Sequence, residues 1–123
     1  MSANVMPVVT SRGFLQSRTV ADLNGESSGQ LNISLAAPST VELSVACDYD
    51  MLSSGDARLL GLALSTPADL GDCFAILSLS PGVPPKEVRI TLPGGSHTIY
   101  WIGIRSGVAA NCNLSHLCAR VVR

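Results

Sequence analysis

Residues 88–107 read VRITLPGGSHTIYWIGIRSG, and this stretch indicates the fold of the whole chain. Residues 88–92 alternate apolar and polar side chains, which is the period-two pattern of a half-buried strand. Residues 93–95 give a Pro-Gly-Gly turn signal, because proline cannot continue a ladder or a helix and glycine tolerates positive φ. The chain returns through a continuously apolar run at 99–104, which suits a central strand. The stretch therefore predicts two strands joined by a short turn.

The same patterns extend along the rest of the chain. Residues 31–35 and 41–47 alternate in the same way, while 59–64 and 73–79 are continuously apolar. Separators rich in proline, glycine and serine recur about every ten residues, so helices of ordinary length do not fit between them. We therefore predict an all-β fold, a single antiparallel β-sandwich of about eight strands with jelly-roll or Greek-key connections. The expected strands lie at 18–23, 30–36, 40–47, 58–64, 73–79, 87–92, 97–105 and 114–122.

Residues 1–17 lack this periodicity and carry Pro7 and Gly13. We expect them to form an extended arm before a β-sandwich domain at 18–123. Both a frayed terminus and a partner-binding arm fit such a segment. The apolar residues that would contact a partner are Val5, Val8, Val9, Phe14 and Leu15.

The composition excludes several classes of partner. Charged residues make up 14% of the chain, and 8 basic against 9 acidic residues give a formal net charge of −1. So few charges cannot provide the cluster of phosphate contacts that nucleic-acid binding requires. No apolar run is long enough to span a bilayer, and the N-terminus lacks the basic and apolar regions of a signal peptide. We therefore expect a protein made in a cytoplasm, with no nucleic-acid or membrane partner, whose surface is covered by other proteins or by copies of itself.

The chain has four cysteines, Cys47, Cys73, Cys112 and Cys118. In a reducing cytoplasm they are expected to be buried free thiols that pack as small hydrophobes. Cys112 and Cys118 are close in sequence and could form a disulfide in an oxidising medium, although sequence alone cannot fix the connectivity.

Two groups of residues are candidate metal ligands. Asp48, Asp50 and Asp56 offer oxygen ligands to calcium within one loop region, although the EF-hand spacing is absent and the aspartates also suit ordinary turn hydrogen bonds. Cys112 and Cys118, with His116 between them, offer soft ligands but lack a fourth protein ligand for structural zinc. We expect no metal and no cofactor.

Catalytic and sugar-binding signals are weak. His97 and His116 are the two histidines, no nucleophile elbow accompanies the serines, and we predict no enzymatic activity. His97 is expected to stabilise the start of a strand after the glycine turn. Tyr100 and Trp101 are adjacent in a strand and must face opposite sides, so at least one belongs to the core. That leaves few aromatic side chains for a carbohydrate platform.

Two stretches resemble a known family. Residues 91–107, TLPGGSHTIYWIGIRSG, are similar to the last hairpin of bacterial pre-peptidase C-terminal-type β-sandwiches, and residues 39–50, STVELSVACDYD, to that family's strand entering an acidic loop. The resemblance covers about a quarter of the chain, and it implies that the two strands within residues 88–107 form a hairpin. It implies an extracellular accessory binding module, carbohydrate-binding or calcium-stabilised near Asp48 and Asp50, whereas the chain shows no secretion signal.

The overall character of the chain resembles a second group, the decoration or cement proteins of tailed-phage capsids. Those proteins are small, sparsely charged sandwiches with N-terminal arms, and this resemblance rests on architecture rather than on a motif. It implies a homo-oligomer, such as a trimer, that sits on the major capsid protein and stabilises the virion shell. We therefore expect a non-enzymatic structural or interaction protein located in the virion, with the extracellular binding module as the alternative.

Overall fold

The computed structural model describes residues 18–66, 70–81 and 83–122. The predicted arm, with its apolar residues Val5, Val8, Val9, Phe14 and Leu15, lies outside the described residues. The strands are β1 (Arg18–Asp22), β2 (Ser28–Leu35), β3 (Ser39–Cys47), β4 (Leu59–Ala63), β5 (Ala75–Ser78), β6 (Glu87–Leu92), β7 (Gly95–Arg105), β8 (Val108–Ala109) and β9 (Ser115–Val122). Single 3-10 turns lie at η1 (Tyr49–Met51) and η2 (Leu70–Asp72). Each strand expected from the sequence is present, and the two-residue strand β8 is an addition. The hairpin expected at 88–107 is wrong, because the chain crosses from one sheet to the other at the Pro93–Gly95 turn: β6 pairs with β3, and β7 pairs with β2 and β4.

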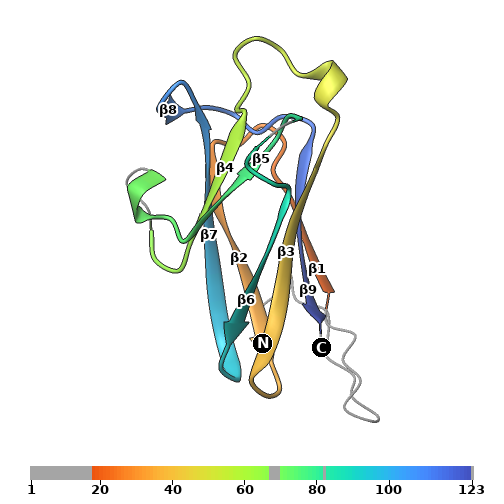
Figure 1. The fold of residues 1–123 in the computed structure, drawn as a ribbon, viewed down its shortest axis with the longest axis vertical. Helices are drawn as coiled ribbons and strands as arrows, with labels where there is room; N and C mark the ends of the chain where they lie inside the picture. Colours follow the sequence, from red (N-terminus) through yellow and green to blue (C-terminus); the bar gives the residue numbers. More distant parts are fainter. Residues whose placement is uncertain (1–17, 67–69, 82, 123) are drawn as a thin grey trace.

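The strands form two antiparallel sheets packed face to face (Figure 1). Sheet A has the order β1-β9-β3-β6, and sheet B has the order β2-β7-β4-β5 with β8 paired to β7. The antiparallel pairs are β1 with β9, β2 with β7, β3 with β6, and β4 with β5. The chain therefore runs as one long hairpin whose two arms pair along their length and are rolled into a sandwich. This is the jelly-roll arrangement of two Greek keys, which the sequence left undecided from other Greek-key connections.

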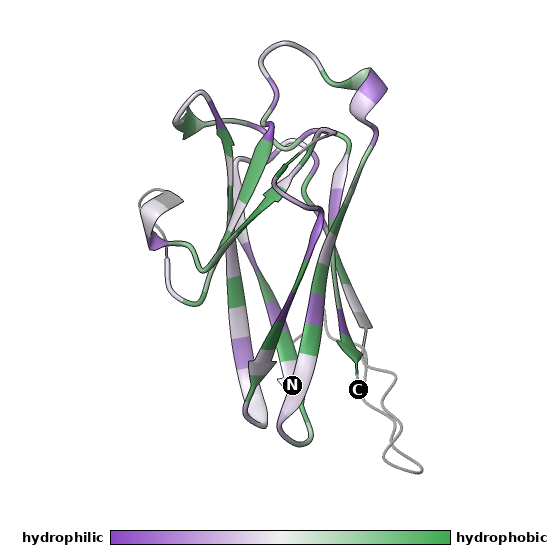
Figure 2. Cartoon of the chain, viewed as in Figure 1, coloured by the Kyte–Doolittle hydropathy of each residue, from purple (hydrophilic) through white to green (hydrophobic). Residues whose placement is uncertain are grey.

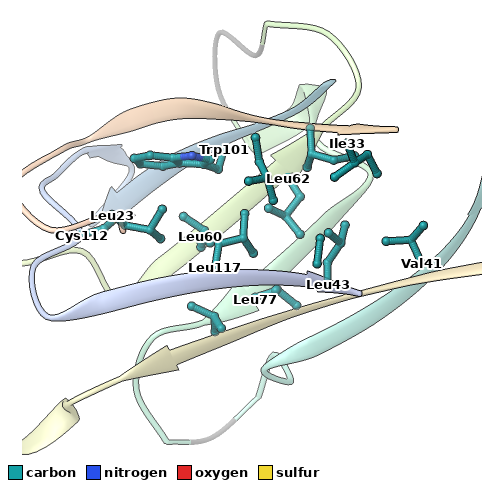
Figure 3. Packing of buried hydrophobic residues seen from close by; sticks show 14 of the residues in the cluster. Leu23, Ile33, Val41, Leu43, Leu60, Leu62, Leu77, Trp101, Cys112 and Leu117 are labelled. Atoms are coloured by element: carbon teal, nitrogen blue, oxygen red, sulfur yellow. The ribbon is translucent and has the colours of Figure 1, made fainter. Parts of the chain in front are cut away.

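The core lies between the two sheets and follows from the alternation in the sequence. Figure 2 shows apolar and polar residues alternating along the long strands, and Figure 3 shows the inward side chains meeting between the sheets. Leu31 and Ile33 of β2 enter the core with Leu43 of β3, Leu62 of β4 and Leu117 of β9, and all five are buried. Each fully buried aliphatic side chain contributes roughly 1.5–3 kcal/mol by leaving water.

One glycine in β2 makes the core geometry possible at the edge of sheet B. Gly29 pairs with Trp101 across the β2–β7 ladder. A Cβ atom at Gly29 would lie 2.5 Å from Cζ2 and 3.2 Å from Nε1 of Trp101. The indole ring therefore occupies the space that a side chain on Gly29 would need. Because Trp101 faces the core, its neighbour Tyr100 faces outward, as the sequence required of the pair.

The turns follow the glycine and proline signals. Gly95 and Gly107 have φ values of +112° and +81°, so the two turns that flank β7 use a backbone region that glycine adopts without strain. His97 lies at the first of these turns, where its Nε2 atom is 2.6 Å from the Pro93 carbonyl oxygen. No helix formed by the described residues is long and apolar enough to cross a membrane.

Candidate functional site

The outer face of sheet A is charged, and a buried carboxylate lies at its centre. Glu42 of β3 lies between Arg89 of β6 and Arg120 of β9, its partners in the strand register. The Arg120 Nε atom donates to Glu42 Oε1 over 2.9 Å, and Arg89 donates to Oε2 from Nη2 over 3.2 Å and from Nε over 3.4 Å. The Glu42 side chain is only 9% exposed, whereas the two arginine side chains are 60% and 50% exposed. The ion pairs therefore join three strands across sheet A.

These contacts set the ionisation of the carboxylate. The hydrogen bond from Arg120 is the largest influence and lowers the pKa of Glu42, and Arg89 lowers it further. Burial opposes both effects but does not outweigh them, so the pKa of Glu42 lies below its ordinary value. An ionised carboxylate with both oxygens occupied is a structural link and is poorly suited to transferring protons.

A shallow depression of about 480 Å³ lies beside this cluster on the outer face of sheet A. It is lined by Val20, Ser44, Val45, Ala46, His116, Cys118 and Arg120. His116 is exposed, and its Nδ1 atom is 3.8 Å from a carboxylate oxygen of Asp22. No group of three potential metal-ligating side chains occurs within residues 18–66, 70–81 and 83–122. Among the described residues, neither histidine therefore belongs to a group of three potential metal ligands.

The aspartates proposed as calcium ligands are not brought together. Asp48 and Asp50 are exposed near η1, whereas Asp56 is 5% exposed and points into the loop packing. Asp56 Oδ2 accepts a hydrogen bond from the Ser53 amide over 2.7 Å, and Oδ1 accepts one from Asn113 Nδ2 over 2.6 Å. Burial raises the pKa of Asp56, but these hydrogen bonds lower it more, and the pKa is below its ordinary value. Asp56 therefore joins two loops at one end of the sandwich.

The cysteines are free thiols, and Cys112 does not pair with Cys118. Cys112 precedes β9 and is completely buried in the core, whereas Cys118 follows Leu117 in β9 and lies on the outer side of sheet A. This structure therefore does not place the two thiols as a pair. Burial, together with the nearby Cys47 and Asp56, raises the pKa of Cys112 to about 12, which keeps this thiol protonated and unreactive.

The outer face of sheet B differs from that of sheet A because none of its described strand residues that point outward is charged. We call the part over β4, β5 and the end of β7 the apolar half, and it contains Leu59, Gly61, Ala63, Ile76, Ile102 and Ile104, together with the hydroxyl group of Ser78. Ile102 and Ile104 are 9% and 4% exposed, yet neither belongs to the core cluster between the sheets. They form a second apolar layer that is largely buried within the domain, and Leu64 and Phe74 are exposed beside it, at the ends of the neighbouring strands, at 50% and 38%.

The remaining part of this face, over β2 and β7, carries only hydroxyl and amide groups and one aromatic ring. We call it the polar half, and it contains Ser28, Gln30, Asn32, Ser34, Ser96, Thr98 and Tyr100. The Asn32 Oδ1 atom accepts hydrogen bonds from Thr98 Oγ1 over 2.9 Å and from Gln30 Nε2 over 3.5 Å. Tyr100 is partly exposed and lies opposite Gln30 in the register.

A depression of about 250 Å³ lies where the two halves meet. It is lined by Ser28, Gly29, Gln30, Thr66, Tyr100, Trp101 and Ile102. Tyr100 and Gln30 reach this depression from the outer face, whereas the Trp101 side chain is 4% exposed and lies on the core side of the sheet. The outer face of sheet B is therefore the candidate functional site.

The sequence analysis did not single out this face. Its residues follow from the alternation in 28–35 and 96–104, which predicts the outward set of each strand. The sequence does not reveal that β2 pairs with β7. The paired residues are about 70 positions apart, and alternation alone does not identify which strand lies beside another.

No protein-family model and no curated protein matches the chain. Among solved structures, it is similar to the pre-peptidase C-terminal domain of collagenase from Bacillus anthracis, at 14% identity over 87% of this chain and 89% of that chain, with a TM-score of 0.45. It is also similar to the K2 cleaved adhesin domain of Lys-gingipain, at 13% identity over 90% of this chain and 72% of that chain, with a TM-score of 0.35. The first neighbour is of the type that residues 91–107 resemble. Neither is a capsid decoration protein, and likenesses this distant carry no argument about function.

Proposed function

We propose that the chain is a non-enzymatic interaction protein that assembles with other proteins through the outer face of sheet B. The observation that carries the proposal is the uncharged apolar half, where Leu64 and Phe74 are exposed at 50% and 38% beside a largely buried layer of aliphatic side chains. Interfaces between proteins are depleted of charge at their centres, where desolvating a charged group costs most. The outer face of sheet A lacks this character, since charged residues lie along all four of its strands.

Residues 1–17 provide a second contact in this proposal. Seventeen residues can extend about 55–60 Å from Arg18, which is far enough to reach a neighbouring copy of the domain. Val5, Val8, Val9, Phe14 and Leu15 would supply apolar side chains for the apolar half of that copy. Contacts of this kind hold a homo-oligomer together without enlarging the folded domain.

In its specific form, the proposal states that this chain is a decoration protein of a virion. The protein would be made in the host cytoplasm, associate with itself, for example as a trimer, and bind between subunits of the major capsid protein to stabilise the shell. The small closed sandwich, the sparse charge and the apolar N-terminal segment support this assignment. A second candidate is an extracellular accessory binding module, which the hydrogen-bonding groups of the polar half favour.

The test is the solution mass of three proteins, measured by light scattering after size exclusion. The full chain is compared with a chain lacking residues 1–17 and with the variant Ile76→Ser in the apolar half. Val20→Ser is the matched control, because Val20 is 50% exposed on the outer face of sheet A. We expect an oligomer that dissociates on removal of the arm and in Ile76→Ser, and that persists in Val20→Ser.

The opposite result would be equally clear. Monomers of identical mass for the full chain and the truncated chain would reject assembly through the arm and favour the extracellular binding module. If Val20→Ser weakens the oligomer and Ile76→Ser does not, the interface lies on sheet A and the proposed use of sheet B is wrong.

A further inference from the structure

The strands at the edges of the two sheets differ in how they are protected from pairing with another chain. The edge strands are β1 and β6 in sheet A and β2 and β5 in sheet B. Folded proteins protect such edges with short strands, charged side chains or proline, because an unpaired edge is a template for another strand. β5 has only 4 residues, β1 has 5 and ends at Asp22, and β6 carries Glu87 and Arg89. β2 has 8 residues and contains neither a charged residue nor a proline.

The backbone groups of alternate residues in β2 point to its open side. The Gly103 amide of β7 donates to the Ser27 carbonyl oxygen over 2.7 Å, which places the odd-numbered residues of this segment in the ladder with β7. In an antiparallel ladder, one residue directs its N–H and C=O groups to one neighbour and the next residue directs them to the other side. The groups that face away from β7 therefore belong to the even-numbered residues of β2, and no described strand pairs with β2 on that side.

The core holds β2 in the extended conformation that a partner strand requires. Leu31, Ile33 and Leu35 are buried between the sheets, at 0%, 3% and 5% exposure. Ser28 and Gln30 are exposed. Because the strand is already ordered by its inward side chains, pairing at its open side costs little further conformational entropy.

The sequence of β2 is complementary to a second copy of itself. Its lack of charge allows two copies to meet without like-charge repulsion. A twofold axis beside Leu31 places Gln30 of one copy opposite Asn32 of the other. The same axis places Ser28 opposite Ser34. All four of these residues direct their backbone groups to the open side, so the two strands offer hydrogen-bonding groups to each other in register. A shift by one residue would place inward side chains opposite outward ones.

We propose that two copies of the chain pair antiparallel along β2, so that their B sheets join into one continuous sheet across a twofold axis. This inference rests on the self-association in the proposed function and adds a strand-edge contact to it. Sheet B has the order β2-β7-β4-β5, so the polar halves of the two copies lie side by side at the centre of the joined sheet. The apolar halves lie at its two ends, where they are available for the other contacts of the assembly.

Amide hydrogen exchange of the full chain, measured at several protein concentrations, tests this pairing residue by residue. The amides of Gln30 and Asn32 should exchange slowly at concentrations where light scattering shows association, and quickly after dilution to the monomer. The amides of Leu31 and Ile33 belong to the ladder with β7 and should exchange slowly at every concentration.

Two variants of Gln30 test the contact, and Thr91→Lys on the edge strand β6 is the matched control because Thr91 is also exposed. Gln30→Lys places two like charges close to the twofold axis and should raise the Kd of the dimer by about tenfold. Thr91→Lys should leave that Kd unchanged. Gln30→Pro removes an N–H group that faces the second copy, so it should abolish the pairing while the ladder between β2 and β7 keeps its bonds.

Mixing two variants tests the register. Gln30 and Asn32 are opposite each other in the proposed dimer, so Gln30→Lys and Asn32→Glu should associate with each other more tightly than either associates with itself. The absence of this preference would overturn the pairing about Leu31.

Two further outcomes would overturn the inference. One is fast exchange of the Gln30 and Asn32 amides in the associated protein. The other is slow exchange of these amides that persists in the monomer and disappears on removal of residues 1–17, which would mean that the arm and not a second copy pairs with β2. The effect of Ile76→Ser on the solution mass tests the contact through the apolar half separately. Slow concentration-dependent exchange at Gln30 with no effect of Ile76→Ser would reject that contact and support the strand pairing.

Discussion

The two outer faces of the sandwich are built from the same alternating strands, yet they distribute polarity in different ways. On sheet A, the central carboxylate Glu42 is paired on both sides by Arg89 and Arg120. On sheet B, no described outward strand residue is charged, and its polar half carries hydroxyl and amide groups with the Tyr100 ring. The first face has its strongest polar groups satisfied within the domain, whereas the second leaves apolar and hydrogen-bonding groups available to another molecule.

This difference indicates a division of roles. Internal ion pairs contribute to the stability of the folded domain and compete with any external ligand for the same groups. Exposed apolar side chains such as Leu64 and Phe74 contribute little to the isolated domain and gain most from a partner. We therefore expect substitutions on sheet A to change stability and not binding, and substitutions on sheet B to change binding with smaller effects on stability.

The largest expected effect comes from the core that both faces share. Leu62 of β4 is fully buried opposite Trp101, so Leu62→Ala should lower the free energy of unfolding by about 2–5 kcal/mol, through lost burial and a residual cavity. Leu64→Ala is the control, because Leu64 is 50% exposed and its loss should change stability by about 0.5 kcal/mol or less. Urea unfolding followed by Trp101 fluorescence measures both. Equal losses would show that Leu62 is no better buried than Leu64, contrary to the described packing.

The next largest effect is expected on sheet A alone. Glu42→Gln keeps the shape of the side chain but removes the charge that two arginines share, so the urea midpoint should fall by less than in Leu62→Ala. The solution mass should remain that of the unaltered protein. If Glu42→Gln changed the solution mass while the domain stayed folded, the outer face of sheet A would be part of the binding surface, and the division between the faces would be wrong.

The sequence predicts most of the fold and little of this division. Alternation and turn residues give strand positions to within about two residues, since they depend on local periodicity. Alternation and turn residues give weaker signals for two features, which are the start of β2 at Ser28 rather than Gln30 and the two-residue strand β8. Pairings are non-local: Glu42 contacts Arg120 across 78 positions of sequence, and no local pattern identifies that partner. For the same reason the sequence could suggest a Cys112–Cys118 disulfide that the layers of the fold separate.

The smallest expected effect distinguishes the two arginines of sheet A. The pKa of Glu42 is lowered, so its ionised form contributes stability that is complete above the ordinary carboxyl pKa and is lost as the pH falls through the lower folded value. Arg120 has the shorter contact and the larger influence on this pKa, so Arg120→Gln should bring the pKa of Glu42 closer to its ordinary value than Arg89→Gln does. Both changes in stability should be small, because the guanidinium groups are half exposed and screened by water. NMR titration of the Glu42 carboxyl carbon in the two variants measures the ranking directly. A larger rise in Arg89→Gln would mean that the β3–β6 contact, rather than the β3–β9 contact, holds the carboxylate ionised.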